Sequence, residues 1–173
     1  EEALTLSDRI VVMSSGEIVQ IGSPRDIYNR PANRFVADFV GMSNLMRART
    51  SSADGDRVSV SFPNGRSYVT KAEGNFAHPS DIDVFVRPES VKLAPNAGSP
   101  IGKLSGTVEH IVYAGASTYA HVSVGLAKPV VASLSQKPQD SNAIRIGDEL
   151  SLDWDETDAL LMPALEAGAR RTS

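Results

Sequence analysis

The residues best suited to metal chemistry are two histidines, His110 and His121. If residues 114–117 form the loop between two antiparallel strands, residues 110 and 121 lie opposite each other and both imidazoles stand on one face. Zinc sites usually take three or more protein ligands, but no third His or Cys lies near in the sequence, and Glu109 belongs to the other face. We therefore interpret the histidines as an ordinary cross-strand pair without a metal, and expect His78 to be solvated.

Two further groups of residues could bind ions, but neither has the required arrangement. Calcium loops alternate oxygen ligands around a central Gly. The acidic run lacks this pattern and is interpreted as a solvated turn; it contains Asp153, Asp155, Glu156 and Asp158. Backbone N–H groups bind anions best at the start of a helix. The scattered glycines are therefore interpreted as turn and bulge residues; they are Gly102, Gly106, Gly115 and Gly125.

Arg87, Pro88 and Glu89 place opposite charges beside a rigid residue at the end of an apolar strand. Pro88 ends the strand ladder because it lacks an N–H group, and the planar guanidinium of Arg87 can bind a carboxylate or backbone carbonyls across a barrel. We expect this group to form a structural corner. A contact with a ligand or a partner is the alternative.

Two kinds of element must position these residues. The N-terminal part predicts an opening helix that ends at residues 8–9, a β-hairpin over 10–13 and 17–22, a helix that starts at Pro24 after the cap Ser23, and a helix over 32–40. In the last helix one buried stripe is expected, formed by Phe35, Val36, Phe39 and Val40. The remainder alternates polar and apolar residues, and strands are predicted over 57–62, 66–69, 83–87, 106–113, 118–125, 130–134, 149–154 and 159–162. The fold class is therefore mainly β, a small antiparallel barrel or sandwich preceded by a short α/β part.

Composition excludes several functional classes. The 173 residues include no Cys, which excludes disulfides and thiol chemistry, and no apolar run approaches the roughly 20 residues that span a bilayer. The net charge of −4 and 6% aromatic residues disfavour a nucleic-acid partner. The first residues form a strong helical run without a cap or an initiator Met, so we expect the chain to be cut from a longer protein.

Ordered motifs at the start of the chain carry a family resemblance. They are residues 1–13, Gly16, Gln20, Gly22, Ser23, Pro24, Ile27, Tyr28, Pro31, Ala32 and 35–37. They resemble the end of the nucleotide-binding domain in ATP-binding subunits of ABC importers for polyamines, sugars or iron. Later motifs resemble the transport-associated OB-type (TOBE) domain of the same subunits; they include Gly41, Asn44, Arg87, Pro88, Glu89, 106–108, 113–115, Tyr119, Gly147, Asp148, Leu152 and Trp154.

The resemblance implies a domain organisation and a function. Residues 1–43 would be the end of the nucleotide-binding domain, 44–163 the OB-like TOBE domain and 164–173 a flexible tail. The chain would be the C-terminal dimerisation and regulatory domain of a cytoplasmic ATPase subunit in a spermidine/putrescine-like importer, peripheral at the inner face of the membrane. Its partners would be a second copy and, through the parent, the permease subunits. The alternative is a small-molecule or oxyanion sensor formed where two OB-like domains pair.

Departures from the family pattern limit the activity expected of this chain. The phosphate-binding P-loop, the signature motif and the switch histidine lie upstream in the family, and the pattern G-x-x-x-x-G-K-[ST] does not occur here. We expect no catalysis and no cofactor in this chain, whereas the parent would bind ATP and Mg²⁺. The site residues carried forward, in a structural or regulatory role, are Gly41, Asn44, Arg87, Pro88 and Glu89.

Overall fold

A small N-terminal unit opens the polypeptide in the computed structural model, which describes residues 7–54, 56–71, 79–95, 102–134 and 144–164. The predicted hairpin and both predicted helices are present, as strands β1 (Ile10–Ser14) and β2 (Glu17–Gly22) and helices α2 (Pro24–Asn29) and α3 (Arg34–Phe39). The Ser23 side chain accepts a hydrogen bond from the Asp26 N–H, so the predicted cap of α2 is confirmed. The opening helix over residues 1–6, His78 and the tail from residue 165 lie outside the described residues.

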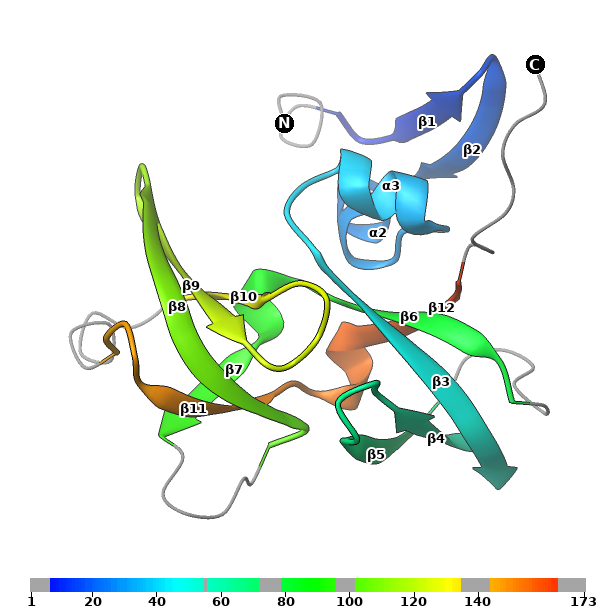
Figure 1. The fold of residues 1–173 in the computed structure, drawn as a ribbon. Coiled ribbons are helices and arrows are strands. Elements are labelled where there is room, and N and C mark those ends of the chain that lie inside the picture. Colours follow the sequence, from blue (N-terminus) through cyan, green and yellow to red (C-terminus); the bar gives the residue numbers. More distant parts are fainter. Residues whose placement is uncertain (1–6, 55, 72–78, 96–101, 135–143, 165–173) are drawn as a thin grey trace.

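Ten strands follow the N-terminal unit in the described residues and form two five-stranded antiparallel sheets (Figure 1). One sheet has the order β12-β6-β3-β4-β5 and the other β10-β9-β8-β11-β7. The mainly β fold class is confirmed. The strands are β3 (Asn44–Asp54), β4 (Arg57–Ser61), β5 (Ser67–Lys71), β6 (Asp81–Val86), β7 (Lys92–Pro95), β8 (Leu104–Ala114), β9 (Ser117–Ser123), β10 (Val130–Ser133), β11 (Glu149–Asp153) and β12 (Ala159–Pro163). Two single turns of 3-10 helix, η1 (Pro88–Ser90) and η2 (Glu156–Asp158), connect strands of different sheets.

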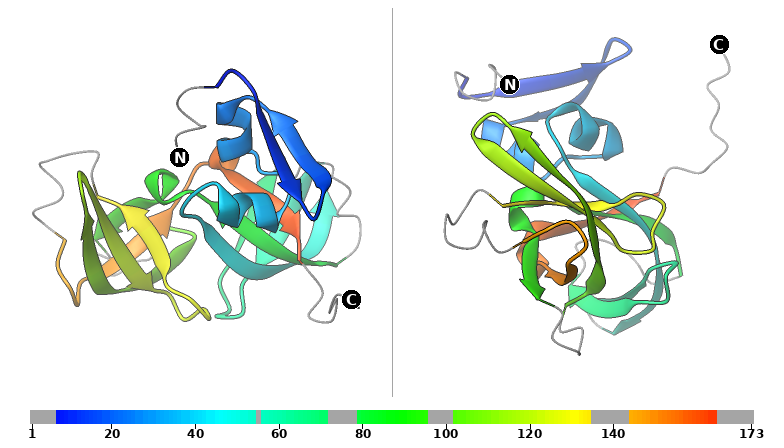
Figure 2. Two further views of the ribbon diagram at one scale, coloured as in Figure 1. Left: turned by 90° about the horizontal axis from the view of Figure 1, so that it is seen from above. Right: turned by 60° about the vertical axis from the view of Figure 1, so that its left-hand side comes forward.

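One apolar core joins the two sheets. It combines residues of β3, β4 and β6 with residues of β8 to β11, and Trp154 is its largest member at 1% exposure. The two sheets lie beside each other, and the N-terminal unit lies over the sheet that contains β3 and β6 (Figure 2). Because a single core serves both sheets, the β-rich part is stabilised as one body.

Strand β3 was not predicted, although it is the middle strand of its sheet. Its buried positions include Asn44, Met46, Ala48 and Thr50, whereas Arg47 and Arg49 are exposed. This alternation has the period of a strand, but it contains none of the β-branched apolar residues on which the other strand predictions depended. The short strand β7 was missed as well.

The predicted stripe on α3 is wrong in part. Val36 is fully buried and Val40 partly buried, but Phe35 is 41% exposed and Phe39 is 71% exposed. The two rings stack on each other with centroids 6.0 Å apart, along an i, i+4 edge of the helix. The side of α3 that faces the interior presents Val36 and Ala37.

Candidate functional site

A buried arginine at the end of β6 joins the N-terminal unit to the β-rich part. Arg87 is 2% exposed, and its Nε and Nη2 atoms donate hydrogen bonds to the Tyr28 carbonyl at 3.1 and 2.7 Å. Its Nη1 atom donates to the carbonyls of Gly41 and Met42 at 3.2 and 2.9 Å. These carbonyls belong to the end of α2 and to the segment before β3. The guanidinium therefore holds three backbone segments together.

Aromatic rings enclose the same guanidinium. Its central carbon lies 4.0 Å from the centre of the Tyr28 ring and 4.8 Å from that of Phe85, within the range of cation–π contacts. Burial lowers the pKa of Arg87 from its ordinary value. The group nevertheless stays charged, since the ordinary pKa of arginine lies far above neutral pH.

Glu89 lies in the short helix η1, whose first residue is Pro88, and contacts Tyr28 next to Arg87. The Oε1 atom of Glu89 accepts a hydrogen bond from the Tyr28 hydroxyl at 2.8 Å. Burial, together with this hydrogen bond to the carboxylate, raises the pKa of Tyr28 to about 12. Arg87 and Glu89 thus both contact α2 from one short segment.

Gly41 lies where a larger residue would not fit. Its φ of +148° belongs to the region that favours glycine, and a Cβ atom there would lie 3.3 Å from Cε2 of Tyr28. The missing side chain lets the backbone approach the Tyr28 ring and present its carbonyl to Arg87.

Asn44 makes a second junction close to the first. Its amide donates to the Val131 carbonyl at 2.8 Å and accepts from the Val131 N–H at 2.7 Å, so it bonds the start of β3 to β10 in the other sheet. Four of the five residues singled out in the sequence therefore take part in these two junctions; they are Gly41, Asn44, Arg87 and Glu89. Arg87 binds backbone carbonyls, as expected, but these carbonyls come from the N-terminal unit and the link to β3 and not from across the barrel.

The two histidines pair as predicted. His110 lies opposite His121 between β8 and β9, and Glu109 is the extra residue of the irregularity next to them. Within the described residues no group of three or more His, Asp or Glu side chains could hold a metal ion.

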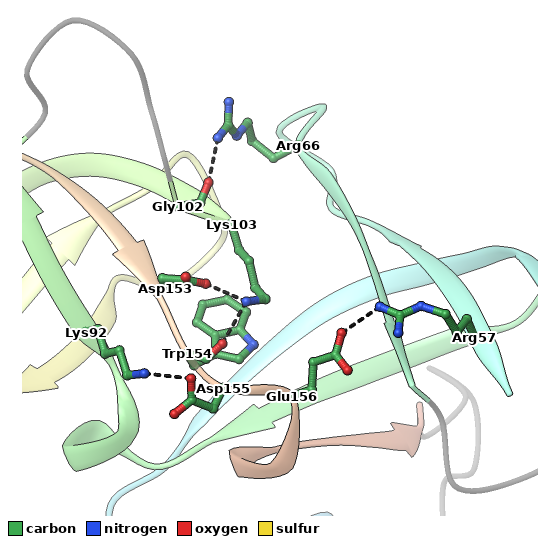
Figure 3. A network of polar contacts seen from close by, with 9 residues as sticks. All are labelled: Arg57, Arg66, Lys92, Gly102, Lys103, Asp153, Trp154, Asp155 and Glu156. Atoms are coloured by element: carbon green, nitrogen blue, oxygen red, sulfur yellow. Dashed lines mark hydrogen bonds and ion pairs between the residues drawn. The ribbon is translucent and has the colours of Figure 1, made fainter.

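The acidic run is a solvent-exposed turn, as expected, and three of its four carboxylates also pair with cations (Figure 3). Lys103 contacts Asp153, Lys92 lies 2.6 Å from Asp155, and Arg57 lies 2.7 Å from Glu156. Lys103 also donates to the Trp154 carbonyl, and Arg66 donates to the carbonyl of Gly102. These contacts bind the connection between β11 and β12 to β4, β7 and the start of β8.

The predicted turn and bulge glycines divide into two groups. Gly115 and Gly125 have positive φ values and lie in turns, as expected. Gly102 and Gly106 instead allow close backbone contact, because a Cβ atom would collide with the carbonyls of Leu152 and Ser123 respectively.

One buried carboxylate was not predicted from the sequence. Asp83 in β6 is 2% exposed, and its two oxygens lie 3.4 Å from Nη1 of Arg34 and 3.1 Å from Nε of Arg47. Arg47 is directly opposite Asp83 in the sheet, whereas Arg34 comes from α3. The alternation in β3 was the only available signal, since contact with α3 depends on the tertiary fold.

None of the helices among the described residues is long and apolar enough to cross a membrane.

Comparison with known proteins identifies the β-rich part. Residues 84–162 match the model of the TOBE domain family. The chain is 49% identical over 125 residues to the spermidine/putrescine import ATP-binding protein PotA of Mesorhizobium japonicum. The aligned region covers 72% of this chain and 33% of that protein. Proteins of the same name from Ruegeria pomeroyi and Rubrobacter xylanophilus are 38% and 33% identical, over 89% and 94% of this chain and 41% and 42% of their own lengths. The chain thus spans less than half the length of these relatives.

A solved structure supports the fold independently of sequence. The cytoplasmic molybdate-binding protein ModG, in its molybdate-bound form, superposes with a TM-score of 0.58 at 13% identity, over 70% of this chain and 96% of ModG. The OB-like fold class is confirmed by this likeness. Residues 84–162 belong to the TOBE domain family, and most of the chain is similar in sequence to ATP-binding subunits of ABC importers.

Proposed function

We propose that the chain is the C-terminal dimerisation and regulatory domain of the cytoplasmic ATPase subunit of a spermidine/putrescine-like ABC importer. The observation that carries the proposal is the relationship to import ATP-binding proteins over 72–94% of the chain, together with the TOBE domain over 84–162. In the whole importer the parent subunit would lie at the inner face of the membrane, bound to the permease subunits.

The Arg87 junction suits a domain that follows the movements of an ATPase. Its hydrogen bonds to the Tyr28, Gly41 and Met42 carbonyls tie the N-terminal unit to the strand β6. A displacement of the N-terminal unit would therefore be passed to the β-rich part as a rigid movement.

The outer face of the first hairpin is suited to contact the rest of the parent subunit. Four apolar side chains on this face, opposed in pairs across β1 and β2, are 44–59% exposed; they are Val11, Met13, Ile18 and Ile21. Contiguous exposed apolar surface commonly marks a contact region. We expect the remaining part of the parent subunit, where ATP and Mg²⁺ would bind, to cover it.

A sensor of small molecules or oxyanions is the second candidate. It is favoured by the fold shared with ModG, a molybdate-binding protein. In this version two copies would pair and hold the ligand at their interface, and ligand would strengthen the pairing.

Sedimentation equilibrium of the 173-residue chain tests both candidates. The dimerisation domain is expected to associate reversibly at tens of micromolar without additives. A monomer throughout would contradict self-association by this part of the subunit. Dimers that form only with molybdate, sulfate or spermidine would favour the sensor.

A further inference from the structure

A cavity of about 570 Å³ lies along the seam between α3, the start of β3 and the loop 125–129. We infer that this cavity, the seam pocket, binds a small organic anion, namely a carboxylate or phosphomonoester attached to an apolar group. The pocket is formed within one copy of the chain. Its occupation therefore requires neither dimerisation nor the ATP-binding motifs of a parent protein.

The charge of the seam pocket favours an anion. Three cationic side chains line it, Arg34, Arg47 and Lys128, against the single carboxylate of Asp83. The cations still outnumber the carboxylates when Asp38, which pairs with Arg34 outside the pocket, is counted. A polyamine would meet like charges here and is excluded by the same reasoning.

The two arginines have donors left for a ligand. A guanidinium carries five N–H groups. The contacts of Arg47 with the described residues use its Nε atom on Asp83, and those of Arg34 use Nε on Asp38 at 3.5 Å and Nη1 on Asp83. The buried carboxylate orients both arginines in advance, which reduces the entropy lost on binding.

Most of the remaining lining is apolar and matches a ligand with a hydrophobic body, although Ser43 and Asn44 also line the pocket. The apolar part is contributed by both sheets and by the loop; the residues include Leu45, Met46, Pro63, Leu126 and Pro129. Small-molecule sites usually combine such a lining with a few polar groups and have volumes of about 300–1,000 Å³. An inorganic anion would leave most of this surface in contact with water.

Isothermal titration calorimetry of the 173-residue chain tests the proposal with phenyl phosphate as the probe. We expect it to bind with a Kd below about 1 mM, and at least about tenfold more tightly than inorganic phosphate, because the ring adds apolar burial. Benzyl alcohol and spermidine should not bind. Absence of phenyl phosphate binding at millimolar concentration, or equal binding of inorganic phosphate, would overturn the inference.

Variants locate the binding. Arg47→Gln should weaken phenyl phosphate binding by about tenfold or more, since a charged hydrogen-bond donor to the anion is lost. Arg49→Gln is the matched control, because Arg49 lies on the same exposed face of β3 and pairs with Asp81 at 3.9 Å outside the pocket. Lys128→Gln leaves the contacts of Asp83 intact and should also weaken binding by severalfold. Unchanged affinity in both pocket variants would overturn the assignment.

Discussion

At the scale of single residues, Arg87 has the clearest structural role, because it joins the N-terminal unit to the β-rich part. Its guanidinium donates to three backbone carbonyls and lies between two aromatic rings. A planar group with several fixed donors can satisfy all of these acceptors at once, whereas an ammonium group has a single charged head.

We expect Arg87→Lys to lower the free energy of unfolding by roughly 2–3 kcal/mol, because buried carbonyls lose their donors. Urea unfolding of the chain measures this difference. Arg49→Lys, at an exposed ion pair, serves as the control and should change stability by no more than about 0.5 kcal/mol. An Arg87 variant as stable as the control would show that the junction contributes little.

Tyr28 makes the stability of the chain depend on pH in the alkaline range. Its pKa of about 12 in the folded state lies above the ordinary value near 10, so the folded state retains the proton longer than the unfolded state. The stabilising contribution is complete below about pH 10 and is lost as pH rises through 12. Tyr28→Phe should therefore make stability fall less steeply between these pH values.

The measurement is urea unfolding at a series of pH values, with phenolate absorbance as a second readout. Tyr113→Phe is the control, since Tyr113 is 79% exposed. If the Tyr28 and Tyr113 variants lose stability with pH in the same way as the unsubstituted chain, the hydroxyl of Tyr28 is not held by Glu89 in solution.

At the scale of elements, α3 separates buried from exposed apolar residues over a few positions. Val36 and Ala37 contact two different clusters, one with Val12 and Ile27 and the other with Phe85 and Met162. The side chain of Phe39 is 71% exposed and is therefore much less buried than those of Val36 and Ala37.

We expect Val36→Ala to cost on the order of 2 kcal/mol of stability, and Phe39→Ala less than about 1 kcal/mol, although it removes the larger side chain. Thermal unfolding followed by circular dichroism would compare the two. The opposite order would mean that the Phe35–Phe39 stack is covered in solution, for example by a second copy.

At the scale of the whole molecule, the chain should not bind nucleotide. The pattern that supplies backbone N–H groups and a Lys for phosphates is absent from its 173 residues. Calorimetry with Mg-ATP at millimolar concentration should show no saturable binding with micromolar affinity. Micromolar binding would contradict the proposed division of labour between this chain and the rest of the parent subunit.

Local patterns in the sequence were sufficient for several features. Hairpin β1–β2, the cap Ser23, the pairing of His110 with His121 and the strand β12 follow from turn chemistry, capping and alternation, which act over a few residues. The family resemblance also follows from sequence, because it depends on ordered motifs. Arg87 was singled out by its position at a strand end.

Long-range contacts decided the rest. The acceptors of Arg87 lie 45 to 59 residues away in the chain, and Asp83 receives Arg34 from 49 residues away. Whether Phe39 or Val36 is buried depends on which side of α3 meets β1 and α2, and periodicity alone does not specify that side. Only the tertiary structure brings these segments together, because burial and charge pairing are properties of the packed chain rather than of its local sequence.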